Sequence, residues 1–261
     1  MNRTLQRLLA TAATGIVLAG TLGAGTALAA RATVPRVSDP AAARAGVDRC
    51  APLRVIARAE PTVANLQAVG RCEIDRRLET LTKLQSVVDA STALTDAHEA
   101  ALDNILSSTG SGLRALRAEI DGDSTVEALR EDIRRIAEDY RVYVLVARQV
   151  ALVTAGDTVD ATAAGLATAA ERLEAAIDRA EAAGKDVKDA RAHLATMIAA
   201  VGKADAAVDG VAEAVLDLTP AAWNAGTAGP VLKDARESLR HAAGALREAV
   251  KAARALLADL R

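Results

Sequence analysis

Apolar side chains recur every three or four residues from about residue 51 to the end of the chain. This spacing places them along one face of an α-helix and differs from the strict alternation of a half-buried strand. It predicts helices over residues 51–59, 62–90, 96–120, 124–184, 186–218 and 231–260. No segment has a convincing strand pattern, so we expect an all-α fold.

The longest predicted helix covers residues 124–184, because no proline interrupts this segment. Ser124 and Glu127 have the spacing of a capping box at its start, and Gly184 is suited to end it. A continuous helix of about 59 residues would be roughly 88 Å long.

The helix lengths indicate how the helices pair. Those before residues 124–184 and those after them are each about half as long as the central helix. We therefore expect elongated antiparallel helical bundles of the coiled-coil type, with two three-helix bundles sharing one long central helix. Residues 50–153 would form the first bundle and residues 154–261 the second. A compact four- or five-helix bundle, with the central helix broken near Gly156, is the alternative.

Residues 139–153, DYRVYVLVARQVALV, are apolar almost all round the predicted helix. Such a helix is usually buried, and Arg148 and Gln149 argue against a membrane span. We expect a buried joint between the two bundles, in which the tyrosines pack rather than hold a ligand or metal. The side chains predicted to form it are Leu94, Tyr140, Tyr143 and Trp223.

Residues 1–30 have the pattern of a secretory signal peptide. Arg3 and Arg7 precede an uncharged apolar stretch that ends in Ala27–Leu28–Ala29, small residues at the positions that a signal peptidase requires. Residues 31–49 contain two prolines and no apolar period, which indicates a flexible lead-in. We expect a protein that is secreted or held in the cell envelope, with no stable membrane span after cleavage. An uncleaved anchor is the alternative.

The charged residues are mixed along the chain. Lys and Arg number 32 and Asp and Glu 34, so removal of Arg3 and Arg7 leaves a net charge of about −4. Nucleic acid or anionic lipid would require a concentrated basic face. Flat ligands usually bind on aromatic faces, but the chain has one Trp, two Tyr and no Phe. We expect no nucleic acid and no cofactor, but a protein or cell-envelope partner of unknown identity.

Cys50 and Cys72 are the two cysteines of the chain. In an oxidising compartment they are expected to form an intrachain disulfide. Free thiols and an intermolecular bridge are the alternatives. Two cysteines without a nearby histidine are too few ligands for a zinc site.

Motifs that carry chemistry are scarce. The histidines His98, His193 and His241 lie on three separate predicted helices, so a shared metal site would need them to meet by coincidence. The segment DGDSTVEALRED, residues 121–132, has part of the spacing of a calcium loop, but Val126 replaces the required glycine and Asp132 the final glutamate. Helix capping explains the same residues. We expect no catalytic residues, no metal site and no enzymatic activity.

The blocks LTDAH (94–98) and DYRVYVLV (139–146), with the C-x21-C spacing and an Ala-rich helical tail, resemble a group of exported all-helical actinobacterial proteins with no assigned function. The resemblance implies an exported helical protein and no particular activity. Our first hypothesis is a non-enzymatic envelope or extracellular scaffold or partner-binding module. The alternative is a membrane-active, pore-forming-like helical protein, although the scarce aromatic residues argue against interfacial insertion.

Overall fold

The computed structural model describes residues 48–260. Within this range the chain forms helices joined by turns, and no strand occurs, so the predicted all-α class is confirmed. The expected signal peptide at 1–30 and nearly all of the expected lead-in at 31–49 lie outside the described residues.

The helices begin and end close to the predicted positions in the first half of the chain. Their bounds, in chain order, are α2 (Ala51–Ala59), α3 (Val63–Ala90), α4 (Asp96–Gly122), α5 (Val126–Glu138), the π-helical turn η3 (Val142–Val146), α6 (Ala147–Ala182), α7 (Lys188–Val208), α8 (Val211–Leu216), α9 (Pro220–Asn224) and α10 (Ala228–Asp259).

Threonine side chains cap four of these helices at the N-terminus. Thr62, Thr95, Thr125 and Thr219 each accept a hydrogen bond from a backbone N–H three residues further on, which satisfies one of the unpaired donors of the first turn. The cap of α5 is therefore Thr125 and not Ser124, which corrects the predicted capping box by one residue. Gly184, with φ +81°, follows the end of α6 as predicted.

The predicted helix over 124–184 is not continuous. It is interrupted after Glu138, and Arg141 has φ +44°, the left-handed conformation that is rare outside glycine. Two side-chain hydrogen bonds stabilise the backbone at this break. Arg141 Nε donates to Asn224 Oδ1 at 2.7 Å, and Asn224 Nδ2 donates to the Glu138 carbonyl at 3.1 Å. The alternative break at Gly156 does not occur, because α6 passes through this residue.

The predicted helix over 186–218 is also divided. Gly210 has φ +69°, a left-handed conformation that interrupts the helix between α7 and α8. The predicted loop at 219–230 contains the short helix α9, and α10 begins early enough to include Pro230 in its first turn. Proline is tolerated there because a first-turn nitrogen has no intrahelical acceptor.

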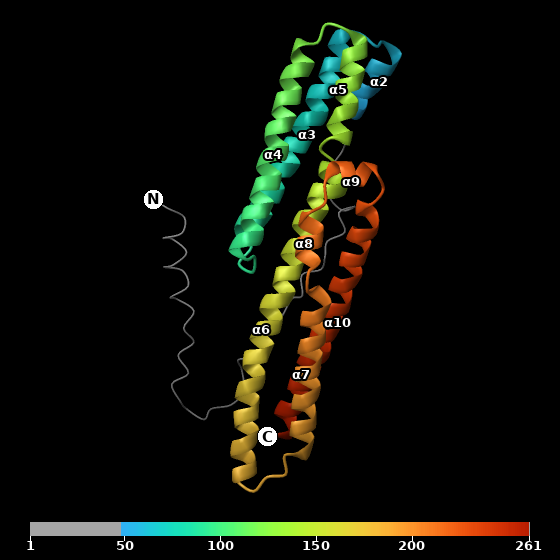
Figure 1. Ribbon diagram of the computed structural model, residues 1–261. Helices are drawn as coiled ribbons and strands as arrows, with labels where there is room; N and C mark the ends of the chain where they lie inside the picture. The colour runs from blue at the N-terminus through green and yellow to red at the C-terminus, as the bar shows by residue number, and fades with distance from the viewer. Residues whose placement is uncertain (1–47, 261) are drawn as a thin grey trace, which may run out of the picture. The chain divides into compact units, whose positions relative to one another are not determined.

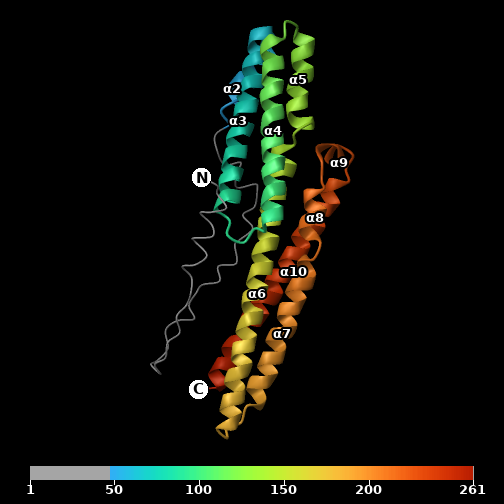
Figure 2. The ribbon, with the colours of Figure 1, turned by 60° about the vertical axis from the view of Figure 1, so that its left-hand side comes forward.

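The helices form two sets, and within each set they pack side by side (Figures 1 and 2). Helices α3, α4 and α5 pack on one another, with α2 against α3; helices α6, α7 and α10 form the second set, with α8 against α6. One buried apolar cluster includes Leu113 of α4, Val150 of α6 and Leu239 of α10, so its members come from both sets. The division into domains 50–153 and 154–261 stays a prediction.

The predicted disulfide between Cys50 and Cys72 is present, with the two Cα atoms 5.8 Å apart. It ties the start of α2 to the middle of α3. A helix of nine residues is too short to be stable by itself in water, so α2 depends on this bond and on its packing against α3.

We expect reduction of the Cys50–Cys72 bond to lower the free energy of unfolding by about 3 kcal/mol, because the bond limits the freedom of the unfolded chain. Urea unfolding with and without a thiol-free reductant measures this difference. The double variant C50A/C72A is the control, and it should show no response to reductant. Equal stability of the oxidised and reduced wild-type protein would contradict the prediction.

The substitution Gly112→Ala tests the packing of Tyr140 on α4. A Cβ at this position would lie 2.5 Å from Tyr140 Cε1, so the ring must move, and we expect a loss of about 1–3 kcal/mol in the free energy of unfolding. The matched control is Gly165→Ala in α6, where a Cβ meets nothing within 4 Å. We expect the control to gain about 0.5–1 kcal/mol from helix propensity. Thermal or urea unfolding compares the two, and a neutral G112A would be inconsistent with this packing.

Candidate functional site

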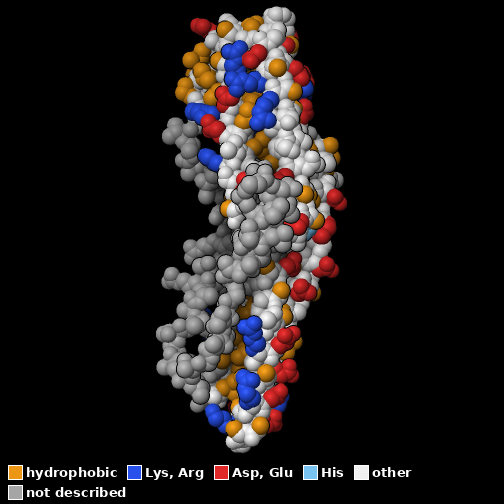
Figure 3. Space-filling view, turned by 90° about the vertical axis from the view of Figure 1, so that its left-hand side faces the viewer, with side chains coloured by type: hydrophobic (Ala, Val, Ile, Leu, Met, Phe, Trp, Pro, Cys, Tyr) orange, Lys and Arg blue, Asp and Glu red, His pale blue; other side chains and the backbone are white. Residues whose placement is uncertain are grey.

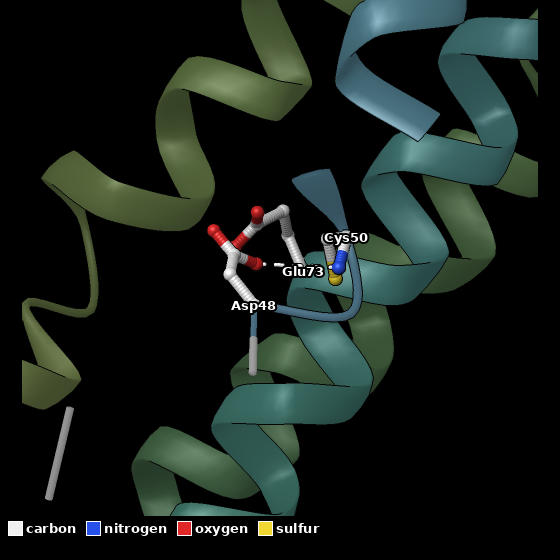
Figure 4. A group of neighbouring side chains, drawn as sticks. All are labelled: Asp48, Cys50 and Glu73. Atoms are coloured by element: carbon white, nitrogen blue, oxygen red, sulfur yellow. Dashed lines mark hydrogen bonds between the residues drawn. The ribbon is translucent and has the colours of Figure 1, made fainter. Parts of the chain in front are cut away.

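The disulfide corner, which comprises Asp48, Cys50 and Glu73, brings together side chains of the types that bind metals. Their ligand atoms all lie within 4.8 Å of one another. Figure 4 shows the Asp48 and Glu73 carboxyl groups turned toward each other beside Cys50. However, the sulfur of Cys50 is bonded to Cys72 and is not available as a thiolate.

Arginines neutralise both carboxylates of the disulfide corner. Asp48 accepts hydrogen bonds from Arg54 and, at 2.8 Å, from Arg76. Glu73 accepts from Arg54 and, at 2.7 Å, from Arg77. The hydrogen bond from the Arg54 guanidinium lowers the pKa of Asp48. Three guanidinium groups around two carboxylates leave no excess negative charge for a cation, so this corner is an ion-pair network that fixes α2 on α3.

The residues of the predicted joint contact different helices. Tyr143 of η3 lies beneath two guanidinium groups of α3, with the Arg77 carbon 5.2 Å and the Arg76 carbon 5.9 Å from the ring centroid. Trp223 of α9 lies beneath Arg148 of α6, at 5.5 Å. These contacts attach α3 and α9 to the segment that follows the break at Arg141.

Tyr140 and Leu94 complete the predicted joint. Tyr140 packs against Gly112 of α4, and partial burial raises the pKa of its hydroxyl. Leu94 lies in the turn before α4 and packs against the main apolar cluster, as Tyr140, Tyr143 and Trp223 do. All four side chains are half-buried. The structure shows packing roles for them, and a functional role of the joint stays a prediction.

Gln149 has a role that the sequence analysis missed. Its side chain is 1% exposed and donates to the carbonyls of Val215 and Leu218, each at 3.0 Å. These carbonyls lie at the C-terminal end of α8, where the regular helical hydrogen bonds stop. The signal was a single amide on the apolar face of the predicted helix, because a buried polar group requires a hydrogen-bond partner.

The buried carboxylate of Asp157 holds the start of α4 against α6. It is 2% exposed and accepts a hydrogen bond from the Thr95 N–H at 2.8 Å. His98 Nδ1 lies 2.7 Å from Asp157 Oδ1. An ionised carboxylate only accepts, so Nδ1 carries the proton and donates. Asp157 was not singled out from the sequence, although its position on the buried face of the α6 segment is the signal that could have identified it.

The other side of the His98 ring faces a second group of carboxylates. His98 Nε2 lies 3.6 Å from Glu213 Oε1 of α8. Asp160 of α6 lies close enough to Asp157 and to Asp205 of α7 that partial burial and these two carboxylates raise its pKa. We call this set of residues the histidine corner: His98, Asp157, Asp160, Asp205 and Glu213.

The remaining histidines have other neighbours. His193 Nε2 lies 3.5 Å from Asp259 Oδ2 near the end of α10. His241 lines a shallow hollow of about 590 Å³ between α7 and α10, together with Lys203 and Arg240. A second shallow hollow, of about 520 Å³, lies beside Cys72. The structure does not bring either histidine to His98.

The residues of the possible calcium loop serve other contacts. Asp121 pairs with Arg71 at 2.5 Å, and Asp132 pairs with Arg135 at 2.8 Å. Thr125 caps α5. Partial burial and the adjacent Asp132 raise the pKa of Asp123. These pairings agree with the interpretation of the segment as a helix start.

Comparisons with family models, with curated proteins and with solved structures give no match to this chain. The resemblance based on residues 94–98 and 139–146 therefore stays an expectation.

Proposed function

We propose that the protein is exported and acts without catalysis, as a helical scaffold or partner-binding module of the cell envelope or the extracellular medium. The observation that carries this proposal is the outward face of α2. Leu53 and Ala57 turn toward the rest of the protein, whereas the apolar residues Pro52, Val55, Ile56 and Ala59 are exposed at helical spacing.

The exposure of this face is large for apolar side chains: Val55 is 63% and Ile56 49% exposed. Figure 3 shows apolar side chains gathered at the upper left of the molecule, where Figure 2 shows α2. Contiguous exposed apolar patches of this kind often mark interaction sites. The disulfide and the arginine network hold α2 in place. The exposed face of α2 is therefore fixed on the protein although it contributes little to the core.

The disulfide also supports the expected export, because such bonds persist in oxidising compartments and are rare in the cytosol. Among the described residues, the ionisable groups of the disulfide corner are engaged in ion pairs between helices. This use of charged side chains fits a structural role.

Cross-linking in the living producer cell tests the proposal. A photoreactive residue at Val55 should give one discrete adduct, because the α2 face is the proposed contact with a partner. The matched control places the same residue at Ala195, an exposed position on α7. Adducts are compared by gel shift and identified by mass spectrometry. The proposal is contradicted by identical adducts at both positions or by none at Val55.

A second function, membrane activity, is favoured by one observation. The segment Val126–Ala182, which joins α5, η3 and α6, contains a window long and apolar enough to cross a membrane, with a mean hydropathy of 1.3. However, 56% of this window is buried inside the protein, as in the core helix of a soluble fold. Insertion would require the surrounding helices to separate from it.

Dye-filled liposomes distinguish the two functions. We expect them to retain their dye at low micromolar concentrations of the protein, because the apolar segment is covered by α3, α4 and α8. A known pore-forming peptide gives the positive control. Rapid leakage at low protein concentration would favour the membrane-active function over the scaffold.

A further inference from the structure

We infer that the histidine corner is a pH-sensitive link between α4 and α8, in which protonated His98 attracts Glu213 and neutral His98 does not. This inference goes beyond the proposed scaffold function and does not depend on it. It rests on the position of the proton in the neutral imidazole, the carboxylate opposite the second ring nitrogen, and the charges around both.

Asp157 fixes the ring of His98 and engages one of its two nitrogens. His98 Nδ1 lies 2.7 Å from Asp157 Oδ1, and Asp157 is 2% exposed and also accepts the Thr95 N–H. A neutral imidazole carries one N–H, and an ionised carboxylate only accepts hydrogen bonds. The proton of neutral His98 therefore lies on Nδ1, and Nε2 has no proton to donate to a second carboxylate.

Glu213 of α8 lies opposite this second nitrogen. Its Oε1 atom is 3.6 Å from His98 Nε2, which is an ion-pair distance and too long for a hydrogen bond. When His98 is neutral, a lone pair of Nε2 faces this oxygen and does not attract it. Protonation places an N–H and a positive charge there, and Glu213, whose side chain is 68% exposed, has room to approach. The attraction between α4 and α8 at this point therefore depends on one proton.

Carboxylates of four helices lie around His98 or beside it in the chain. They are Asp96 and Glu99 of α4, Asp157 and Asp160 of α6, Asp205 of α7 and Glu213 of α8. Within residues 48–260, no Lys or Arg forms an ion pair with any of the last four of these carboxylates. Figure 3 shows acidic side chains along the right-hand edge, on the side where Figure 2 shows α7 and α8. Protonated His98 therefore supplies a positive charge that this group of carboxylates lacks.

Asp160 of α6 responds to pH in the same direction. Partial burial, followed by the Asp157 and Asp205 carboxylates, raises the pKa of its carboxyl group. A raised pKa means that the folded protein binds this proton more tightly than the unfolded chain does. The resulting stability is present at lower pH and is lost as the pH rises through that pKa. The attraction of protonated His98 for Glu213 is also lost as the pH rises, so mild acid should strengthen the packing of α4, α6 and α8.

His241 provides the contrast. It is exposed beside the shallow hollow between α7 and α10, together with Lys203, Arg240 and Glu248. A proton on this ring has two cations and one carboxylate as neighbours, so it adds little attraction between helices. His241 is therefore a matched control for His98.

The test is amide hydrogen exchange of the disulfide-intact protein at about pH 5.5 and about pH 8, on either side of the range in which a histidine usually changes charge. Mass spectrometry follows the exchange, and the rates are corrected for the pH dependence of the chemical step. We expect the amides of α8 and of the first two turns of α4 to be protected about two- to fivefold more strongly at the lower pH, the range of a partly exposed ion pair. Amides in the middle of α3 should be protected equally at both pH values.

Variants locate the effect. Glu213→Gln removes the charge of an exposed side chain without removing the Asp157–His98 bond, so the protein should fold and the pH dependence of α8 should decrease. The double variant E213Q/D160N should bring the pH dependence of α8 to the level of α3. The matched control His241→Gln should keep the wild-type pH dependence.

The nitrogen chemical shifts of the His98 ring give a second readout, which needs no variant. In the neutral ring the proton should lie on Nδ1, and protonation should add one at Nε2. The inference is overturned by equal protection of α8 at the two pH values, by an unchanged pH dependence in E213Q, or by a neutral ring that carries its proton on Nε2.

Discussion

The left-handed backbone at Arg141 is the constraint on which the arrangement of the helices depends. It interrupts a segment whose sequence would allow one continuous helix, and the π-helical turn η3 follows directly. A π-turn changes the direction in which later side chains point, relative to an uninterrupted α-helix. Tyr143 lies in this turn and Gln149 and Asp157 follow it, and each of the three contacts a group on another segment.

A left-handed conformation at a non-glycine residue costs free energy, and it persists only where neighbouring contacts compensate for it. Two hydrogen bonds through Asn224 join the two sides of the break, and the stacking of Arg148 on Trp223 holds the same α9 turn. The short helix α9, which lies in the predicted loop at 219–230, therefore stabilises the break at Arg141.

Polar groups in the interior serve the ends of helices. Gln149 donates to the carbonyls of Val215 and Leu218 at the end of α8, and Asp157 accepts the Thr95 N–H at the start of α4. Both side chains are almost fully buried, and an unsatisfied partner in the interior would cost about 1–3 kcal/mol. The histidine corner arises from the second of these contacts, because the carboxylate that anchors α4 also orients His98. One buried carboxylate therefore fixes both the start of α4 and the orientation of a histidine ring.

The sequence by itself determined the helical class, the end of α6 next to Gly184 and the pairing of the two cysteines. These features depend on residues close in the chain or, for the disulfide, on the absence of any other cysteine. Only the tertiary structure decided the breaks at Arg141 and Gly210, the caps supplied by Gln149 and Asp157, and the approach of Glu213 to His98. The physical reason is distance along the chain: Asp157 lies 59 residues from His98, and Gln149 lies 66 residues from Val215. Periodicity identifies the buried face of each helix, but the partner of a polar side chain on that face depends on how the helices align.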